Sequence, residues 1–230
     1  MKTPFYGSRK YVVFLRSLGY EVNRKRVMRL MKKLGLQAIY PKRRTTVANP
    51  EHQVYPYLLR GLAIEKSNQV WCTDITYLPV GKGNFYLVAI MDWFSRKVLS
   101  WRISNTMDVY FCKSALEDAL LNYGSPEIFN SDQGSQFTSK EFTECLKRVN
   151  IQISMDGRGR CHDNIFIERL WRSLKYELIY IQTFNDGKHL TEEVKKWFNW
   201  YNGERPHQAL EYQTPDEVYR VLLQEMNLSL

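Results

Sequence analysis

The feature that most constrains the fold is a block of strand-like sequence between residues 69 and 104. Residues 69–80 (QVWCTDITYLPV) are rich in β-branched and aromatic side chains. Residues 85–92 (FYLVAIMD) are almost continuously apolar, as is typical of a central strand, and residues 97–104 have the pattern of a third strand. Because only short turns separate these segments, the sequence predicts an antiparallel meander.

Two more strands and several helices follow this meander. The order of elements predicts an α/β fold with a mixed five-stranded sheet and flanking helices. The remaining strands are expected at residues 127–130 and 151–155. Helices are expected at residues 108–123, from a Thr138–Glu141 capping box to Val149, from an Asp163 cap to Glu177, at residues 191–201, and after a cap formed by Thr214 and Glu217.

The first 40 residues predict two short helices and carry most of the positive charge. The first helix spans residues 8–18, and the second begins at an Asn23 cap and ends before Gly35. Residues 1–66 hold fifteen Lys/Arg and three acids and so carry a net charge of +12. The net charge of the whole chain is +9, so the remaining residues carry −3. This imbalance favours a helix-turn-helix arm that binds DNA over a merely solvated basic face. The candidate DNA contacts in the second helix are Arg24, Lys25, Arg26 and Arg29.

The sequence predicts three segments. Residues 1–40 form the helix-turn-helix-like arm, residues 41–68 a linker, and residues 69–225 the main domain with its C-terminal helices. No membrane-length apolar run or signal peptide occurs, which predicts a cytoplasmic protein that works at the nucleoid. The four cysteines lack paired metal-ligand spacing and are expected to be reduced. The linker adds the basic cluster Lys42, Arg43 and Arg44 as candidate contacts to a phosphate backbone.

Three carboxylates have the spacing of a metal site. Asp74 interrupts an apolar strand, Asp132 follows a short strand, and Glu168 lies on a helix, with thirty-five residues between the last two. Taken singly, each could be an ordinary salt bridge, turn or solvated residue. Together they form an oxygen-rich set suited to hard cations, and two Mg²⁺ ions in such a site can catalyse phosphoryl transfer. The predicted catalytic and metal-binding residues are therefore Asp74, Asp132 and Glu168, with Mn²⁺ able to replace Mg²⁺.

The helix that carries Glu168 has two distinct stripes. At about 100° per residue, Asn164, Glu168 and Lys175 fall within about 40° of one another. The apolar side chains lie on a separate stripe that is expected to face the core, and they are Ile167, Leu170, Trp171, Leu174 and Leu178.

These motifs together resemble a known family. The segments WCTDITYLPV, DWFSRKVLSW, NSDQGSQF, SMDGRGRCHDNIFIERLWRSLKYE and YNGERPHQALEYQTPDEVY are similar to those of the second-reading-frame transposases of the insertion-sequence-three family. The resemblance implies an RNase H-like integrase core in which Asp74, Asp132 and Glu168 are the DDE triad. It also implies Mg²⁺-dependent cleavage and joining of double-stranded DNA, with Lys175 as a DNA contact.

The same resemblance implies further partners and contacts. We expect a homo-oligomer on DNA that includes the element ends and the target, and the first-reading-frame helix-turn-helix protein as a possible partner. Asn164 and Arg172 are added as candidate DNA contacts on the Glu168 helix. Two alternatives remain open at this point, an RNase H-like nuclease and a catalytically inert DNA-binding protein. The helix-turn-helix arm speaks against the first, because A-form helices lack an accessible major groove, and the intact triad speaks against the second.

Overall fold

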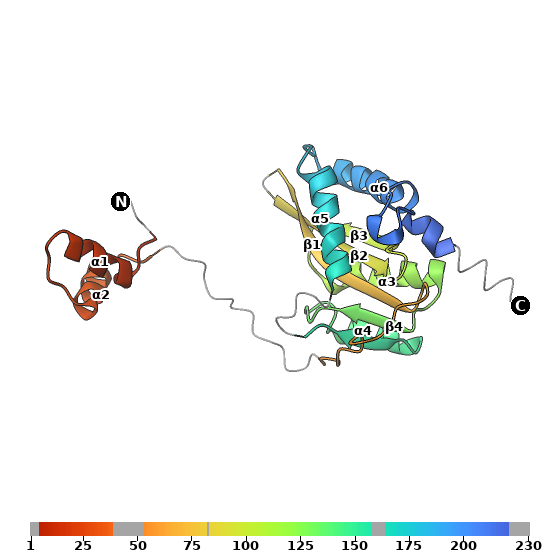
Figure 1. Ribbon diagram of the computed structural model, residues 1–230, viewed down its shortest axis with the longest axis horizontal. Coiled ribbons are helices and arrows are strands. Elements are labelled where there is room, and N and C mark those ends of the chain that lie inside the picture. Colours follow the sequence, from red (N-terminus) through yellow and green to blue (C-terminus); the bar gives the residue numbers. More distant parts are fainter. Residues whose placement is uncertain (1–4, 39–52, 82, 158–163, 221–230) are drawn as a thin grey trace, which may run out of the picture. The chain divides into compact units, whose positions relative to one another are not determined.

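The computed structural model describes residues 5–38, 53–81, 83–157 and 164–220 (Figure 1). The chain divides into two compact units, Met1–Ala48 and Asn49–Leu230. Each unit is considered by itself below.

The N-terminal unit is a pair of helices, α1 (Ser8–Ser17) and α2 (Arg24–Lys33). The Asn23 side chain accepts a hydrogen bond of 2.8 Å from the Arg26 backbone N–H, as the predicted cap requires. The apolar side chains of this unit are little enclosed, since Val27 is the one buried side chain in its described part. Two ten-residue helices cannot enclose a large core, because so little of their surface is turned inward.

The larger unit contains the predicted mixed five-stranded sheet, with the strand order β3-β2-β1-β4-β5. The first three strands form an antiparallel meander, whereas β4 and β5 run parallel to β1 because a helix separates each from the strand before it. The strands are β1 (Val70–Val80), β2 (Gly83–Asp92), β3 (Val98–Ser104), β4 (Ile128–Ser131) and β5 (Gln152–Met155).

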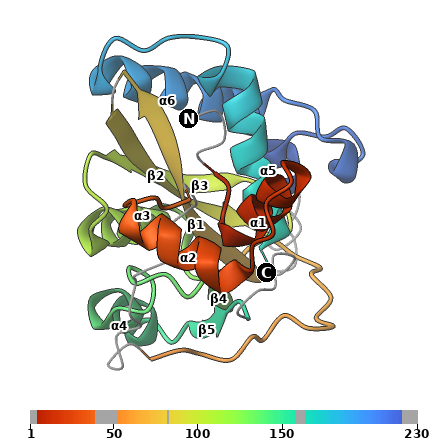
Figure 2. The same cartoon turned by 90° about the vertical axis from the view of Figure 1, so that its left-hand side faces the viewer.

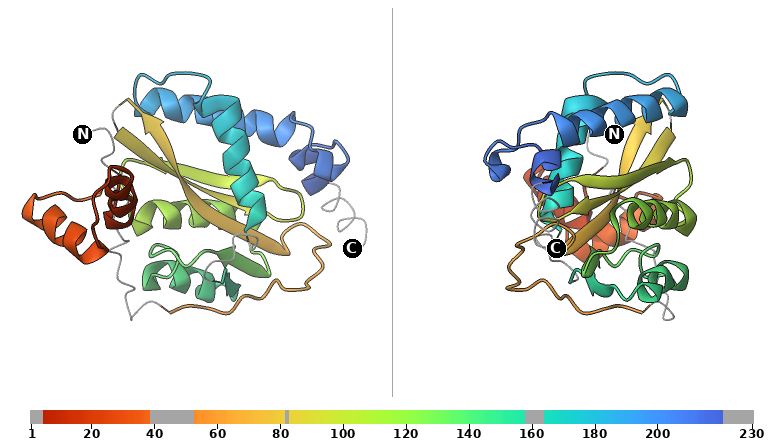
Figure 3. Two further views of the ribbon diagram at one scale, coloured as in Figure 1. Left: turned by 60° about the vertical axis from the view of Figure 1, so that its left-hand side comes forward. Right: turned by 90° about the vertical axis from the view of Figure 1, so that its right-hand side faces the viewer.

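Helices cover both faces of this sheet (Figure 2 and Figure 3). Alternate residues of the central strand β2 supply the two cores. Leu87 and Met91 pack with the helices of one face, whereas Val88 and Ile90 pack with those of the other. On the first face lie α5 (Ile165–Leu174), its π-helical continuation η1 (Lys175–Ile179) and α6 (Gly187–Gly203), and on the second lie α3 (Val109–Tyr123) and α4 (Lys140–Arg148).

Two helix starts differ from the prediction. The cap of α4 is Ser139, whose Oγ accepts from the Phe142 N–H at 3.3 Å, because the Thr138 hydroxyl donates to the Gly134 carbonyl instead. The helix expected from residue 191 begins at Gly187, where the Asp186 side chain caps it.

Other local predictions are settled as follows. The Thr214–Glu217 capping box is confirmed by reciprocal hydrogen bonds of 2.8 and 3.3 Å, and residues 215–220 are helical. Asp163, the expected cap of α5, lies outside the described residues. Cys72, Cys112 and Cys145 are free thiols. Over the described ranges, none of the helices has the length and apolar character needed to cross a membrane.

Candidate active site

Asp74 lies on β1, and Asp132 directly follows the end of the neighbouring parallel strand β4. The β1–β4 register pairs Val70 with Ile128 and Cys72 with Asn130. Continuing this register by two residues brings Asp74 level with Asp132, which directly follows the last residue of β4. Adjacent strands are about 4.8 Å apart, so two residues at one level are close neighbours. The sheet register therefore brings the two aspartates together.

Glu168 comes from α5, which crosses the same strand. The indole Nε1–H of Trp171 donates to Asp74 Oδ2 at 2.9 Å, and the Asn164 amide donates to the Thr73 carbonyl at 3.1 Å. These two bonds attach α5 to β1 on both sides of Glu168 along the helix. Glu168 itself is exposed, one helical turn before Trp171.

The three carboxylates are coupled electrostatically. Burial raises the pKa of Asp74 from its ordinary 3.8 to about 7, and the negative charge of Asp132 is the next largest cause. Glu168 raises the same pKa to a smaller extent, while hydrogen bonds from Ile75 and Trp171 oppose the shift. At neutral pH, Asp74 is consequently balanced between its neutral and ionised forms.

The Asp132 carboxylate is oriented by its own loop. Its Oδ1 accepts the Gly134 backbone N–H at 2.8 Å, which lowers the pKa, whereas loss of solvent around the carboxylate raises it, and the net shift is upward. This desolvation is local to the carboxylate, because the residue as a whole is exposed. A Cβ atom on Gly134 would lie 2.8 Å from Asp132 Oδ1, too close for any unshifted contact.

Two contributors to this site were missed by the sequence reasoning. Trp171 was predicted as a core residue, and it is buried, but its indole N–H also holds Asp74. Gly134 was not among the predicted site residues, although its N–H and its lack of a side chain both serve Asp132. Two signals in the sequence could have identified them. Trp171 is the only residue of the apolar stripe with a ring N–H that can donate a hydrogen bond, and Gly134 follows Asp132 by two residues.

The predicted metal ligands do not form a closed cluster. Across the described parts of the chain, no three His, Cys, Asp or Glu side chains lie close enough to hold a metal ion together. The donor chemistry nevertheless fits a hard divalent cation, because two neighbouring anions hinder the ionisation of Asp74 and a cation would favour it.

The candidate DNA contacts lie in different surroundings. Lys175 is half-buried at the end of α5, and Arg172 is exposed with its guanidinium 6.0 Å from the centre of the Tyr176 ring. Asn164 is buried and bonded to β1, so its side chain supports the strand in this conformation. The candidates of α2 are exposed in the N-terminal unit, and they are Arg24, Lys25, Arg26 and Arg29. Lys42, Arg43 and Arg44 lie outside the described residues.

Known proteins match the chain along most of its length. Residues 64–161 and 149–215 match families described as "Integrase core domain", and residues 2–44 match an "HTH-like domain". The transposase for insertion sequence element IS904 of Lactococcus lactis is 31% identical over 227 residues, covering 92% of this chain and 86% of the relative. Transposase InsF for insertion sequence IS3A of Escherichia coli is 34% identical, covering 78% and 64%. The chain belongs to the insertion-sequence-three family of transposases.

A solved structure shows which fold the larger unit of this chain has. The catalytic core domain of HTLV-2 integrase, in complex with magnesium, superposes with a TM-score of 0.54 at 22% identity, covering 67% of this chain and 97% of that chain. The prediction of an RNase H-like integrase core is thus confirmed. The integrase core and the transposase relatives favour DNA transposition over the two alternatives that the sequence left open.

Proposed function

We propose that this transposase cleaves the ends of an insertion sequence and joins them to target DNA, with Asp74, Asp132 and Glu168 as its catalytic carboxylates. The observation that carries the proposal is the coupling of three carboxylates from β1, the end of β4 and α5, with Asp74 at its centre. Family membership supports the reaction class, because the relatives named above are transposases of insertion sequences.

The same three side chains are proposed to hold divalent cations. When bound, two Mg²⁺ ions would stabilise the charge on the attacking and leaving oxygens of an in-line phosphoryl displacement, and Mn²⁺ should substitute. The protein's part is orientation. Trp171 fixes one oxygen of Asp74, and the Gly134 N–H fixes one oxygen of Asp132.

Double-stranded DNA is the proposed partner of both units. The exposed arginines and lysines of α2 would bind phosphates and enter a major groove, while Lys175 would contact a phosphate near the scissile bond. Two element ends must be processed together, so a homo-oligomer on DNA is expected. The first-reading-frame protein is a further proposed partner, and action at the nucleoid in the cytoplasm follows from the substrate.

A strand-transfer assay tests this proposal. The full chain is incubated with labelled ends of its own element, a plasmid target and Mg²⁺. We expect nicked ends and end–plasmid joined products. Asp74→Asn, Asp132→Asn and Glu168→Gln should each remove both products while DNA binding without metal persists. Asp186→Asn, an exposed helix cap where asparagine serves equally well, is the matched control. Joining at the parent rate by Glu168→Gln would contradict the proposal.

A further inference from the structure

A hollow of about 520 Å³ lies beside α5, away from the face that carries Glu168. Three segments line it. They are the turn after β2 with Arg96, the α5 residues Phe166, Arg169 and Ser173, and the segment after α6, seen in blue beside the cyan α5 in Figure 3. Arg169 follows Glu168 by one residue, which places it about 100° further around the helix. The hollow is thus a second polar site on the same helix.

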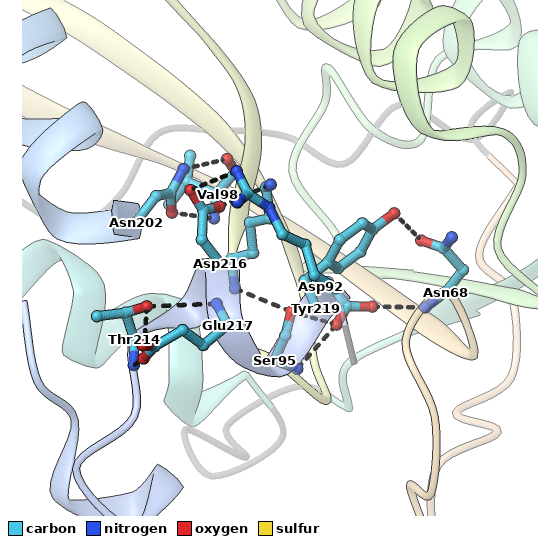
Figure 4. A network of polar contacts seen from close by, with 11 residues as sticks. Asn68, Asp92, Ser95, Val98, Asn202, Thr214, Asp216, Glu217 and Tyr219 are labelled. Carbon is cyan, nitrogen blue, oxygen red and sulfur yellow. Dashed lines mark hydrogen bonds and ion pairs between the residues drawn. The ribbon is translucent and has the colours of Figure 1, made fainter. Parts of the chain in front are cut away.

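The turn that carries Arg96 is held in a defined conformation. Arg96 has a φ of 63°, in the left-handed region that few non-glycine residues adopt. The fully buried Asp92 fixes this turn by accepting hydrogen bonds from the Ser95 N–H at 2.8 Å, the Ser95 hydroxyl at 2.7 Å and the Asn68 N–H at 2.8 Å (Figure 4). The backbone at Arg96 is therefore held in this turn.

The C-terminal wall of the hollow is attached to the same turn. Lys97, the next residue, pairs with Asp216 at 2.7 Å with little solvent exposure on either side chain. The Asn202 amide bonds both the N–H and the carbonyl of Val98, at 2.9 and 2.8 Å (Figure 4). These contacts attach the end of α6 and Asp216, which flank the lining residues 205–212, to the Arg96 turn.

Two arginines of the hollow form no direct ion pair within the described part of the chain. The Arg96 guanidinium lies 3.3 Å from the centre of the Phe166 ring. Among the ion pairs of the described residues, none involves Arg96 or Arg169. Burial lowers the pKa of Arg96 to about 10, and the nearby charge of Arg169 contributes a little. A guanidinium remains charged at neutral pH, and the nearby Asp92 carboxylate favours the charged form of Arg96 without forming an ion pair with it. A bound anion would add direct compensation for both arginines.

Further polar groups converge on the hollow. Arg205 is held by Glu177 through two hydrogen bonds of 2.6 and 3.1 Å, which fix its orientation. His207 Nε2 is buried and has no hydrogen-bond partner in the described structure. Burial lowers the pKa of this histidine to about 4, so the ring is neutral at pH 7, while a hydrogen bond with the Tyr201 backbone opposes this shift. Because Nε2 has no partner, this bond belongs to Nδ1–H, and Nε2 is left as a buried acceptor.

We propose that this hollow binds a phosphate group of the DNA backbone, as a contact distinct from the active site. The planar, unpaired guanidiniums of Arg96 and Arg169 match phosphate oxygens, and Phe166 supplies an apolar wall. The inference rests on the proposed DNA-joining function. It adds a second site at which the larger unit contacts DNA. Arg169 of this site lies about 100° around α5 from the proposed catalytic residue Glu168.

Salt-dependent DNA binding tests this assignment on the full chain. Anisotropy of a labelled element-end duplex is measured from about 50 to 200 mM salt, where each phosphate contact should cost about 3.5-fold in affinity. The double variant Arg96→Asn/Arg169→Gln should lower the salt slope by about two, and asparagine suits the left-handed backbone of residue 96. Arg169→Lys should keep the slope. Arg148→Gln, an exposed arginine that forms none of the recorded ion pairs, should also leave it unchanged.

The outcomes separate this inference from the proposed function. If the double variant fails to fold, Arg169→Gln alone, on an exposed helix position, should still lower the slope by about one. If the parent chain joins ends but the variants keep its salt slope, the phosphate site is wrong and the transposase function stands. Inorganic phosphate that raises the parent Tm without any change in the variants' DNA slope would mark a free-anion site and overturn the DNA assignment. A parent chain that neither binds DNA in a salt-dependent way nor joins ends would overturn both.

Discussion

Asp74→Asn should make the metal-free protein more stable at pH 8. In the folded state, burial and the charge of Asp132 raise the pKa of Asp74 from 3.8 to about 7. Each pKa unit corresponds to about 1.4 kcal/mol, so the ionised carboxylate destabilises the fold by at most about 4 kcal/mol. Asparagine removes the charge and can still accept the Trp171 hydrogen bond. We expect a gain of about 2 to 4 kcal/mol, or roughly 5 to 12 °C in Tm.

The pH dependence gives the sign of this effect. Between pH 4 and 7 the folded state keeps a proton on Asp74 that the unfolded state releases. The free energy of unfolding of the parent should therefore fall as pH rises through this window, and the fall should be smaller in Asp74→Asn, where the raised pKa values of Asp92 and Asp132 still contribute. At pH 4 the two proteins should be nearly equal in stability. The measurement is chemical denaturation at a series of pH values.

Mg²⁺ should reverse the order of stability. A cation bound by the carboxylates stabilises the folded parent by mass action, whereas the variant lacks one ligand and should gain little. Asp186→Asn is the control, because it removes an exposed carboxylate from a cap that asparagine also satisfies. An Asp74→Asn protein that is less stable than the parent at pH 8 without metal, or that keeps the parent's pH slope, would refute the electrostatic reasoning.

Three further changes test other parts of the chain. Gly134→Ala should cut strand transfer at least about tenfold, because its Cβ would displace the Asp132 carboxylate. Gly83→Ala, whose Cβ would make only an ordinary contact with the Val80 carbonyl oxygen at 4.0 Å, should not, and equal joining rates would contradict this. Lys175→Ala should reduce the salt slope of DNA binding by about one while Mg²⁺ binding, followed calorimetrically, is unchanged. Deleting residues 1–40 should abolish specific end binding in gel shifts yet leave a core with a cooperative thermal transition; undiminished binding at matched salt would exclude the arm as the recognition module.

Periodicity predicted the sheet because the strands are governed by local pattern. The apolar run of residues 85–92 lies in β2, whose side chains pack into the cores on both faces of the sheet. A strand with apolar residues at consecutive positions must be covered on both faces. The buried stripe of α5 was likewise correct, since Ile167, Leu170 and Trp171 are all buried. What the pattern could not give is the register between β1 and β4, which sets Asp74 level with Asp132, because that pairing joins residues 58 positions apart.

Asn164 shows where helical phase stops being informative. Its placement beside Glu168 assumed 100° per residue, but Asn164 is the N-cap, with φ −130° and ψ 33° outside the helical range. Its side chain therefore leaves the helical stripe and bonds the Thr73 carbonyl of the neighbouring strand. Sequence could identify the Glu168 helix and its inner face, whereas the direction of a capping residue depends on the loop before it.

The π-helical turn after α5 keeps the end of this helix packed on the core and positions Glu177. Leu178 and Ile179 are both buried, yet in an α-helix they would lie about 100° apart, and Ile179 would point about 140° away from Leu174. The wider π turn, closed by the Tyr180 N–H to the Lys175 carbonyl at 2.8 Å, lets both face the core. It also carries Glu177, which fixes Arg205 at the rim of the phosphate hollow. Because the irregular turn begins only at Lys175, the regular phase between Glu168 and Lys175 is kept. The proposed catalytic face and the proposed phosphate site are therefore separated by the geometry of a single helix.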